Sequence, residues 1–126
     1  MPPLSPRPGF RCNACGQPTL AIVRKLELPP DADSDEVQVQ LARCGPCGAG
    51  AVALYEESRR GAGESWHHRG HPASEATLRT VEEEMAVCAT PTDRHCQCST
   101  HLGWAAGGYR RHLGRESFPM ELAKGG

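Results

Sequence analysis

Large apolar side chains are what this sequence has least of. Aromatic residues make up only 5% of it, two each of Phe, Trp and Tyr, while 14 glycines and 11 prolines further reduce the residues that can form a packed interior. A chain of 126 residues with this composition is not expected to fill two cores by burial alone. A structural zinc stabilises small finger peptides by about 10–16 kcal/mol, so a bound metal is the expected substitute for the missing core.

The sequence also lacks a long apolar segment and an excess of charge. Residues 1–9 are rich in proline and predict a lead-in rather than a secretory signal, and no window is long enough to cross a bilayer. These features predict a cytoplasmic protein that has no membrane partner. A net charge of −1 and a pI near 6.6 remove the strongest signature of a general nucleic-acid binder and leave only a local basic patch as a route to one.

Cysteine, in contrast, is abundant and regularly spaced. In a reducing compartment, paired Cys-x-x-Cys motifs indicate metal binding or redox chemistry, and the odd total of seven argues against a complete disulfide framework. Two thiolates three residues apart can bind one tetrahedral zinc if the chain turns tightly, and a glycine just after each pair permits such a turn. The first predicted zinc site consists of Cys12, Cys15, Cys44 and Cys47, with Gly16 and Gly48 as the turn residues.

The segments around these motifs read as strands. Residues 19–28 contain a short apolar run followed by alternation, residues 37–41 alternate strictly, and residues 51–55 form a third candidate strand. Residues 29–36, with two prolines and four acidic residues, are expected to be a loop. The order of knuckle, hairpin, knuckle and returning strand in residues 10–57 resembles the zinc-ribbon superfamily. That resemblance implies a fold and a metal but no particular activity.

The remaining half predicts a helix and a second metal-binding segment, which makes the chain α+β. Residues 58–73 are rich in glycine and histidine and are expected to be a linker. Ser74 is a plausible N-cap for a helix that places Leu78, Val81, Met85 and Cys88 on one face and ends at Thr90-Pro91. The predicted organisation is a lead-in (1–9), a three-stranded zinc ribbon (10–57), a linker (58–73), a helix with a zinc-binding segment (74–113) and a tail (114–126).

Three cysteines and a histidine lie close together in this second half. The spacing Cys-x7-Cys-x-Cys-x2-His loosely resembles CCCH zinc fingers, but its middle gap of one residue is much shorter than that family uses. RNA binding is therefore not carried over from the resemblance. Three thiolates and one imidazole do complete a closed tetrahedral shell, with His95 as a competing ligand. The second predicted site consists of Cys88, Cys96, Cys98 and His101, so two Zn²⁺ ions are expected in all.

His67 and His71 form a third candidate cluster, because they would share a helix face if residues 64–71 were helical. Gly63, Gly70 and Pro72 argue against that helix, so solvated loop histidines are the preferred interpretation. Trp66 and Trp104 are expected to anchor the two halves against each other, although an exposed tryptophan would suit a partner surface.

Three functions remain open at this point. The preferred one is a small, non-enzymatic adaptor or regulatory protein with structural zincs and a protein partner, since both sites would use all four coordination positions. The first alternative is a nucleic-acid-associated zinc ribbon that uses arginines near the knuckles, together with Arg110, Arg111 and Arg115. The second is a metal-dependent enzyme or thiol redox sensor that uses His67 and His71, or Cys96 and Cys98. No catalytic residue is singled out.

Overall fold

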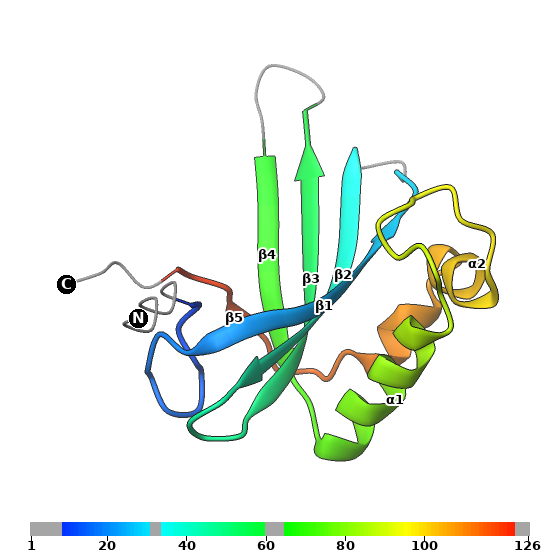
Figure 1. Ribbon diagram of the computed structural model, residues 1–126. Helices are drawn as coiled ribbons and strands as arrows, with labels where there is room; N and C mark the ends of the chain where they lie inside the picture. Colours follow the sequence, from blue (N-terminus) through cyan, green and yellow to red (C-terminus); the bar gives the residue numbers. More distant parts are fainter. Residues whose placement is uncertain (1–8, 31–33, 60–64, 123–126) are drawn as a thin grey trace, which may run out of the picture.

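The computed structural model describes residues 9–30, 34–59 and 65–122, and these form an α+β structure (Figure 1). Most of the expected lead-in and part of the acidic loop, residues 31–33, lie outside the described residues. A five-stranded antiparallel sheet has its strands side by side in chain order. The strands are β1 (Leu20–Leu28), β2 (Glu36–Cys44), β3 (Gly50–Ser58), β4 (Ser65–Pro72) and β5 (Phe118–Pro119).

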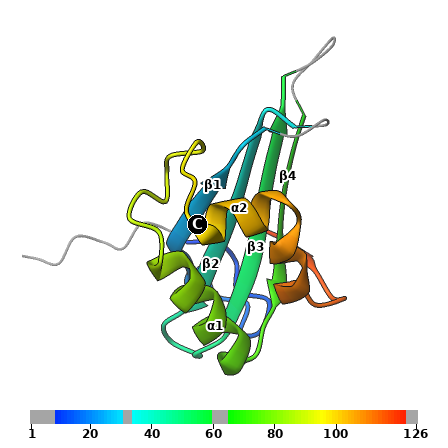
Figure 2. The ribbon, with the colours of Figure 1, turned by 90° about the vertical axis from the view of Figure 1, so that its right-hand side faces the viewer.

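One face of the sheet is covered by helices (Figure 2). These are α1 (Glu75–Ala86), α2 (Ser99–Ala105) and the short 3₁₀ helix η1 (Gly108–His112). The alternation along β2 turns Val37, Val39 and Leu41 toward them, and the three side chains are at most 3% exposed. Apolar residues of β1, β3 and the helices complete this main core.

The predicted helix is confirmed as α1. The hydroxyl of Ser74 accepts a hydrogen bond from the backbone N–H of Thr77, which satisfies one of the free donors at the helix start. Leu78, Val81 and Met85 are the residues that α1 buries, at the spacing of one helix face. The helix ends at Ala86, before the expected stop at Thr90-Pro91.

At the end near the two Cys-x-x-Cys motifs, the sheet closes into a ring on the side opposite the helices. Phe10 forms β-bridges with both Leu20 and Leu122, so the segment before β1 lies between β1 and the segment that follows β5. Since β5 pairs with β4, backbone pairing runs around the whole end of the sheet. Inside it is a small second core of Cys12, Leu20, Ala42, Cys44, Ala53 and Met120, with Phe10, Ile22, Ala49 and Phe118 packed against it.

The chain expected to be a linker and a tail contributes strands instead. Residues 58–73 contain β4, and residues 114–126 contain β5. The signal for β4 was weak because its side chains on the helix-covered face are His67, Arg69 and His71, so no apolar alternation marks it. Gly70 was the available clue in the sequence, because a glycine within a strand often marks a place where another group approaches closely. In the structure, a Cβ at this position would lie 2.5 Å from the ring of Phe118. The three strands expected from the sequence are thus part of a five-stranded sheet.

The two tryptophans have different environments. Trp104 is 2% exposed and belongs to the main core, so it anchors α2 to the sheet as expected. Trp66 is 63% exposed and lies on β4, so it does not anchor the two halves against each other, and the alternative of an exposed tryptophan applies. Among the described residues, no helix has the length and apolar character needed to cross a membrane.

Candidate metal centres

The two Cys-x-x-Cys-Gly motifs fold into matching knuckles. In the first, the backbone N–H of Gly16 donates to the carbonyl of Cys12 at 2.9 Å, and in the second, Gly48 donates to Cys44 at the same distance. Both glycines have φ of +76°, a conformation that costs other residues about 1–2 kcal/mol. The predicted use of glycine after each pair is therefore confirmed.

The knuckles bring four sulfur atoms together at the ring-closed end of the sheet. The ligand atoms of Cys12, Cys15, Cys44 and Cys47 all lie within 4.8 Å of one another. The Sγ atoms of Cys12 and Cys47 are 3.6 Å apart, and those of Cys15 and Cys44 are 3.8 Å apart. Thiolates at about 2.3 Å from a tetrahedral zinc lie about 3.8 Å from each other, so the cluster has the size of such a site. All seven cysteines are free thiols.

Electrostatics in this first cluster also favour a cation. The hydroxyl of Thr19, 3.0 Å from the Cys44 sulfur, lowers the pKa of Cys44 to about 6. A hydrogen bond from the backbone of Ala49 lowers the pKa of Cys47, but the neighbouring Cys44 sulfur and burial outweigh it and raise that pKa to about 12. One thiolate therefore opposes the formation of the next, and a bound cation would remove this repulsion.

The second cluster joins the end of α1 to the start of α2. Cys88 follows α1 and is 6% exposed, while Cys98 is the N-cap of α2, where its sulfur accepts a hydrogen bond from the backbone N–H of His101. The Sγ atoms of Cys88 and Cys96 are 3.6 Å apart. The ligand atoms of Cys88, Cys96, Cys98 and His101 all lie within 4.8 Å of one another.

His101 directs its Nδ1 atom at this cluster. Nδ1 lies 3.3 Å from the sulfur of Cys88 and 3.2 Å from that of Cys98, close to the roughly 3.6 Å expected across a tetrahedral zinc. The side chain is 1% exposed, and its Nε2 atom is buried without a hydrogen-bond partner among the described residues. A neutral imidazole that uses Nδ1 as a ligand carries its proton on Nε2. His95 is not part of the group.

Burial and hydrogen bonding shift the pKa values of two thiols in the second cluster in opposite directions. Burial raises the pKa of Cys88, while a hydrogen bond with the side chain of Thr90 is the largest of the effects that lower the pKa of Cys96. Two clusters that can each hold one metal ion are thus present among the described residues.

His67 and His71 are not brought together. Both lie on β4 rather than on a helix, and positions four apart on a strand are separated by about 13 Å. The ring Nδ1 of His71 is instead 2.9 Å from the carbonyl oxygen of Gly114. The solvated-loop interpretation is also wrong, because these residues form a strand.

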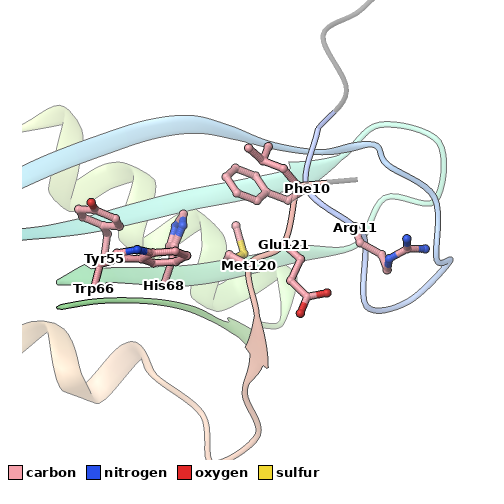
Figure 3. Close-up of a pocket in the computed structure, with 8 residues that line it drawn as sticks. Phe10, Arg11, Tyr55, Trp66, His68, Met120 and Glu121 are labelled. Atoms are coloured by element: carbon pink, nitrogen blue, oxygen red, sulfur yellow. The ribbon is translucent and has the colours of Figure 1, made fainter. Parts of the chain in front are cut away.

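Sequence reasoning missed a cavity of about 740 Å³ beside the ring closure, which we call the aromatic mouth (Figure 3). Its rings come from three separate segments, so no local motif predicted it. The period-two spacing of Trp66, His68 and Gly70 was the only local sign that they share a face. The residues that line it are Phe10, Arg11, Tyr55, Trp66, His68, Met120, Glu121 and Leu122.

Comparison of the chain with protein-family profiles, curated proteins and solved structures gave no match.

Proposed function

We propose that this protein is a non-enzymatic binding protein, an adaptor or regulatory module, whose fold is held by two structural zinc ions. The observation that carries the proposal is that each cluster supplies four protein ligands at tetrahedral spacing. A zinc held by four protein side chains has no position left for a water or a substrate, which is typical of structural sites. Seven free thiols are consistent with a reducing, cytoplasmic location.

We further propose that the first site and its strands form a zinc ribbon. Support comes from the order of the elements: a knuckle at residues 12–15, the β1–β2 hairpin, a knuckle at residues 44–47, and then β3. The two knuckles have the same backbone hydrogen bonds, as expected if they bind one ion from opposite sides. In this proposal β4 and β5 extend the ribbon into the ring-closed sheet.

The environment of Arg43 and Arg111 supports a protein partner over a nucleic acid. Arg43 donates two hydrogen bonds to the carboxylate of Glu75, each 3.2 Å long, and it also lies 3.8 Å from Glu82. Arg111 pairs with Glu84. Nucleic-acid binding draws its affinity from cations that neutralise phosphates, and carboxylates of α1 compete for these cations.

The metal content tests the structural role. Native mass spectrometry at neutral pH is expected to count two Zn²⁺ ions per chain, because the donor atoms divide into four thiolates for one site and three thiolates with one imidazole for the other. Thiol titration of the same sample, without denaturant, should then find the cysteines protected. One ion together with three freely titrating thiols would contradict the second site and leave the first intact.

Oligonucleotide binding separates the adaptor from the nucleic-acid alternative. We expect no binding to mixed DNA or RNA oligonucleotides with a dissociation constant below about 10 μM at physiological salt. Such binding is much weaker than that of typical specific complexes. Fluorescence anisotropy with labelled oligonucleotides measures this directly. Sub-micromolar binding that weakens when Arg110 and Arg111 are changed to glutamate would overturn the adaptor proposal.

A further inference from the structure

The aromatic mouth opens onto the sheet face opposite the helices. Tyr55 and His68 are directly opposite each other on β3 and β4, and Trp66 is the next residue of β4 on the same face. The His68 ring makes edge-to-face contacts with Phe10 and Tyr55, with centroids 5.2 and 5.3 Å away. Its Nε2 lies 2.6 Å from the side-chain oxygen of Gln40, which fixes the ring in this row. The side chains of Tyr55, Trp66 and His68 gather on one side of the sheet (Figure 3).

Carboxylates lie directly beside this row of rings. Glu57 is opposite Trp66 on the neighbouring strand, and its carboxylate accepts a hydrogen bond from the hydroxyl of Tyr55 at 3.0 Å. On its other side, Glu57 is opposite Glu36 of β2, so two carboxyl groups meet across the strands. When both groups of such a pair are ionised, their repulsion destabilises the sheet, and a cation at this place relieves it. Gln38 donates to Glu36 and also to Glu27, which places a third carboxylate on the same face.

Within residues 9–30, 34–59 and 65–122, the cations near this group compensate it only in part. The Nε of Arg59 lies 3.2 Å from Glu57, whose side chain is 16% exposed, but the arginine side chain is 61% exposed, so solvent screens part of the attraction. Lys25 is opposite Gln40 on the same face and is exposed. Burial, the hydrogen bond to Glu57 and the charges of Glu57 and Glu36 raise the pKa of Tyr55, which agrees with a negative potential at its ring. Arg11 and Glu121 lie at the other end of the mouth and offset each other in charge.

Trp66 presents a large apolar surface next to these carboxylates. Its side chain is 63% exposed, whereas Trp104 in the main core is 2% exposed. Exposed tryptophans are among the residues that contribute most to binding when a partner covers them. An indole face beside a carboxylate is suited to a guanidinium group, which stacks on aromatic rings and donates paired hydrogen bonds to carboxylates.

We propose that the aromatic mouth binds an arginine side chain of a partner protein, with the guanidinium group stacked on Trp66 and hydrogen-bonded to Glu57. The aliphatic stem of the arginine lies along Tyr55 and His68. Arginine fits better than a methylated ammonium group, because the latter has few or no N–H donors for the carboxylates. This inference rests on the proposed function as a binding protein and specifies the chemistry of the partner.

Two short peptides test the proposal on the full chain with its zinc bound. Both are blocked at the ends and consist of glycine and serine around one central residue, which is arginine in the first and its neutral isostere citrulline in the second. Binding is followed by the amide NMR signals of residues 55–57 and 66–68 and by tryptophan fluorescence in a Trp104→Phe background. The arginine peptide is expected to bind at least about tenfold more tightly than the citrulline peptide, since only it gains the cation–π and charged hydrogen bonds.

Two variants and a control complete the test. Trp66→Ala, followed by NMR, and Glu57→Gln are each expected to weaken binding of the arginine peptide by about tenfold. Val23→Ala, a similarly exposed apolar position on β1 outside the mouth, should leave binding unchanged. Equal binding of the two peptides, or no binding of either by a protein that holds two zinc ions, would overturn the inference. The zinc count of each sample shows separately whether the proposed structural role stands.

Discussion

Changing Cys44 to serine is expected to unfold the ring-closed end of the protein. Cys44 is 2% exposed, its sulfur is 3.8 Å from that of Cys15, and the second core that surrounds it contains few large side chains. A four-sulfur site that loses one thiolate binds zinc far more weakly, and in small modules that binding energy is folding energy. The loss is expected to exceed about 5 kcal/mol, which is comparable to the whole stability of a domain.

Three measurements report on the Cys44→Ser variant. Native mass spectrometry should count one zinc fewer than in the unmodified protein. The melting temperature should fall by at least about 15 °C, and the amide NMR signals of residues 9–22 and 42–53 should lose their dispersion. Unchanged zinc content with a melting temperature within a few degrees of the original would show that the sheet does not depend on this metal.

Thr19→Val is the matched control for Cys44→Ser. It keeps all four sulfurs and removes only the hydroxyl that lies 3.0 Å from the Cys44 sulfur. The expected cost is that of one hydrogen bond to a charged group, about 1.5–3 kcal/mol. Both zinc ions should remain bound in this variant, so the control separates loss of the metal from local disturbance of the knuckle.

His101→Ala is expected to release the second metal and the helical segment around it. His101 is a buried residue of α2, and the same helix carries Trp104 into the main core. Without the metal, residues 88–112 keep their apolar contacts and a few polar ones, such as the backbone hydrogen bond from Glu27 to the carbonyl of Pro91 and the Arg111–Glu84 pair. We expect a loss of more than about 4 kcal/mol in the free energy of unfolding, within the range seen when a structural metal is lost.

Tryptophan fluorescence reports this release when Trp66 is first replaced by phenylalanine. The emission of Trp104 should then move to longer wavelength as its indole leaves the core, and native mass spectrometry should count one zinc ion. The signals of residues 12–15 and 44–47 should remain dispersed, because the first site is separate. Unaltered emission together with two bound ions would contradict the role of His101 as a ligand.

His101→Cys distinguishes a lost ligand from a lost side chain. Nδ1 is the ring nitrogen nearer to the backbone, so a cysteine sulfur at this position lies at a similar distance from the main chain. Four thiolates also form a common structural zinc site. The cysteine variant is therefore expected to retain two ions and most of the stability that the alanine variant loses.

The parts of the structure that were predictable from sequence are those in which local spacing determines the chemistry. The knuckles at Cys12–Cys15 and Cys44–Cys47 need only a tight turn and a glycine, and both the turn and the glycine conformation are present. The cluster of Cys88, Cys96, Cys98 and His101 was recognisable because its residues are close in sequence and offer the donors of a tetrahedral site. Helix α1 followed from Ser74 and the spacing of its apolar residues.

The parts that could not be predicted depend on contacts between distant segments. Strand β4 has polar residues on the helix-covered face and a glycine under Phe118, so its pattern becomes meaningful only when β5 is in place. The aromatic mouth combines Phe10, Tyr55 and Trp66, which are far apart in the chain. His67 and His71 illustrate the converse error, because the assumed helical spacing of four becomes a long separation on a strand.

The bridges from Phe10 to Leu20 and Leu122 also impose an order on folding during synthesis. A growing chain has all four sulfurs of the first site available once Cys47 has left the ribosome, so this site can bind zinc early. The ring that surrounds the second core cannot close until residues 118–122 emerge, about 70 residues after Cys47. Until then, Leu20 and Ala53, which the closed ring buries, lie on an open sheet edge and face, where a chaperone or a second nascent chain can reach them.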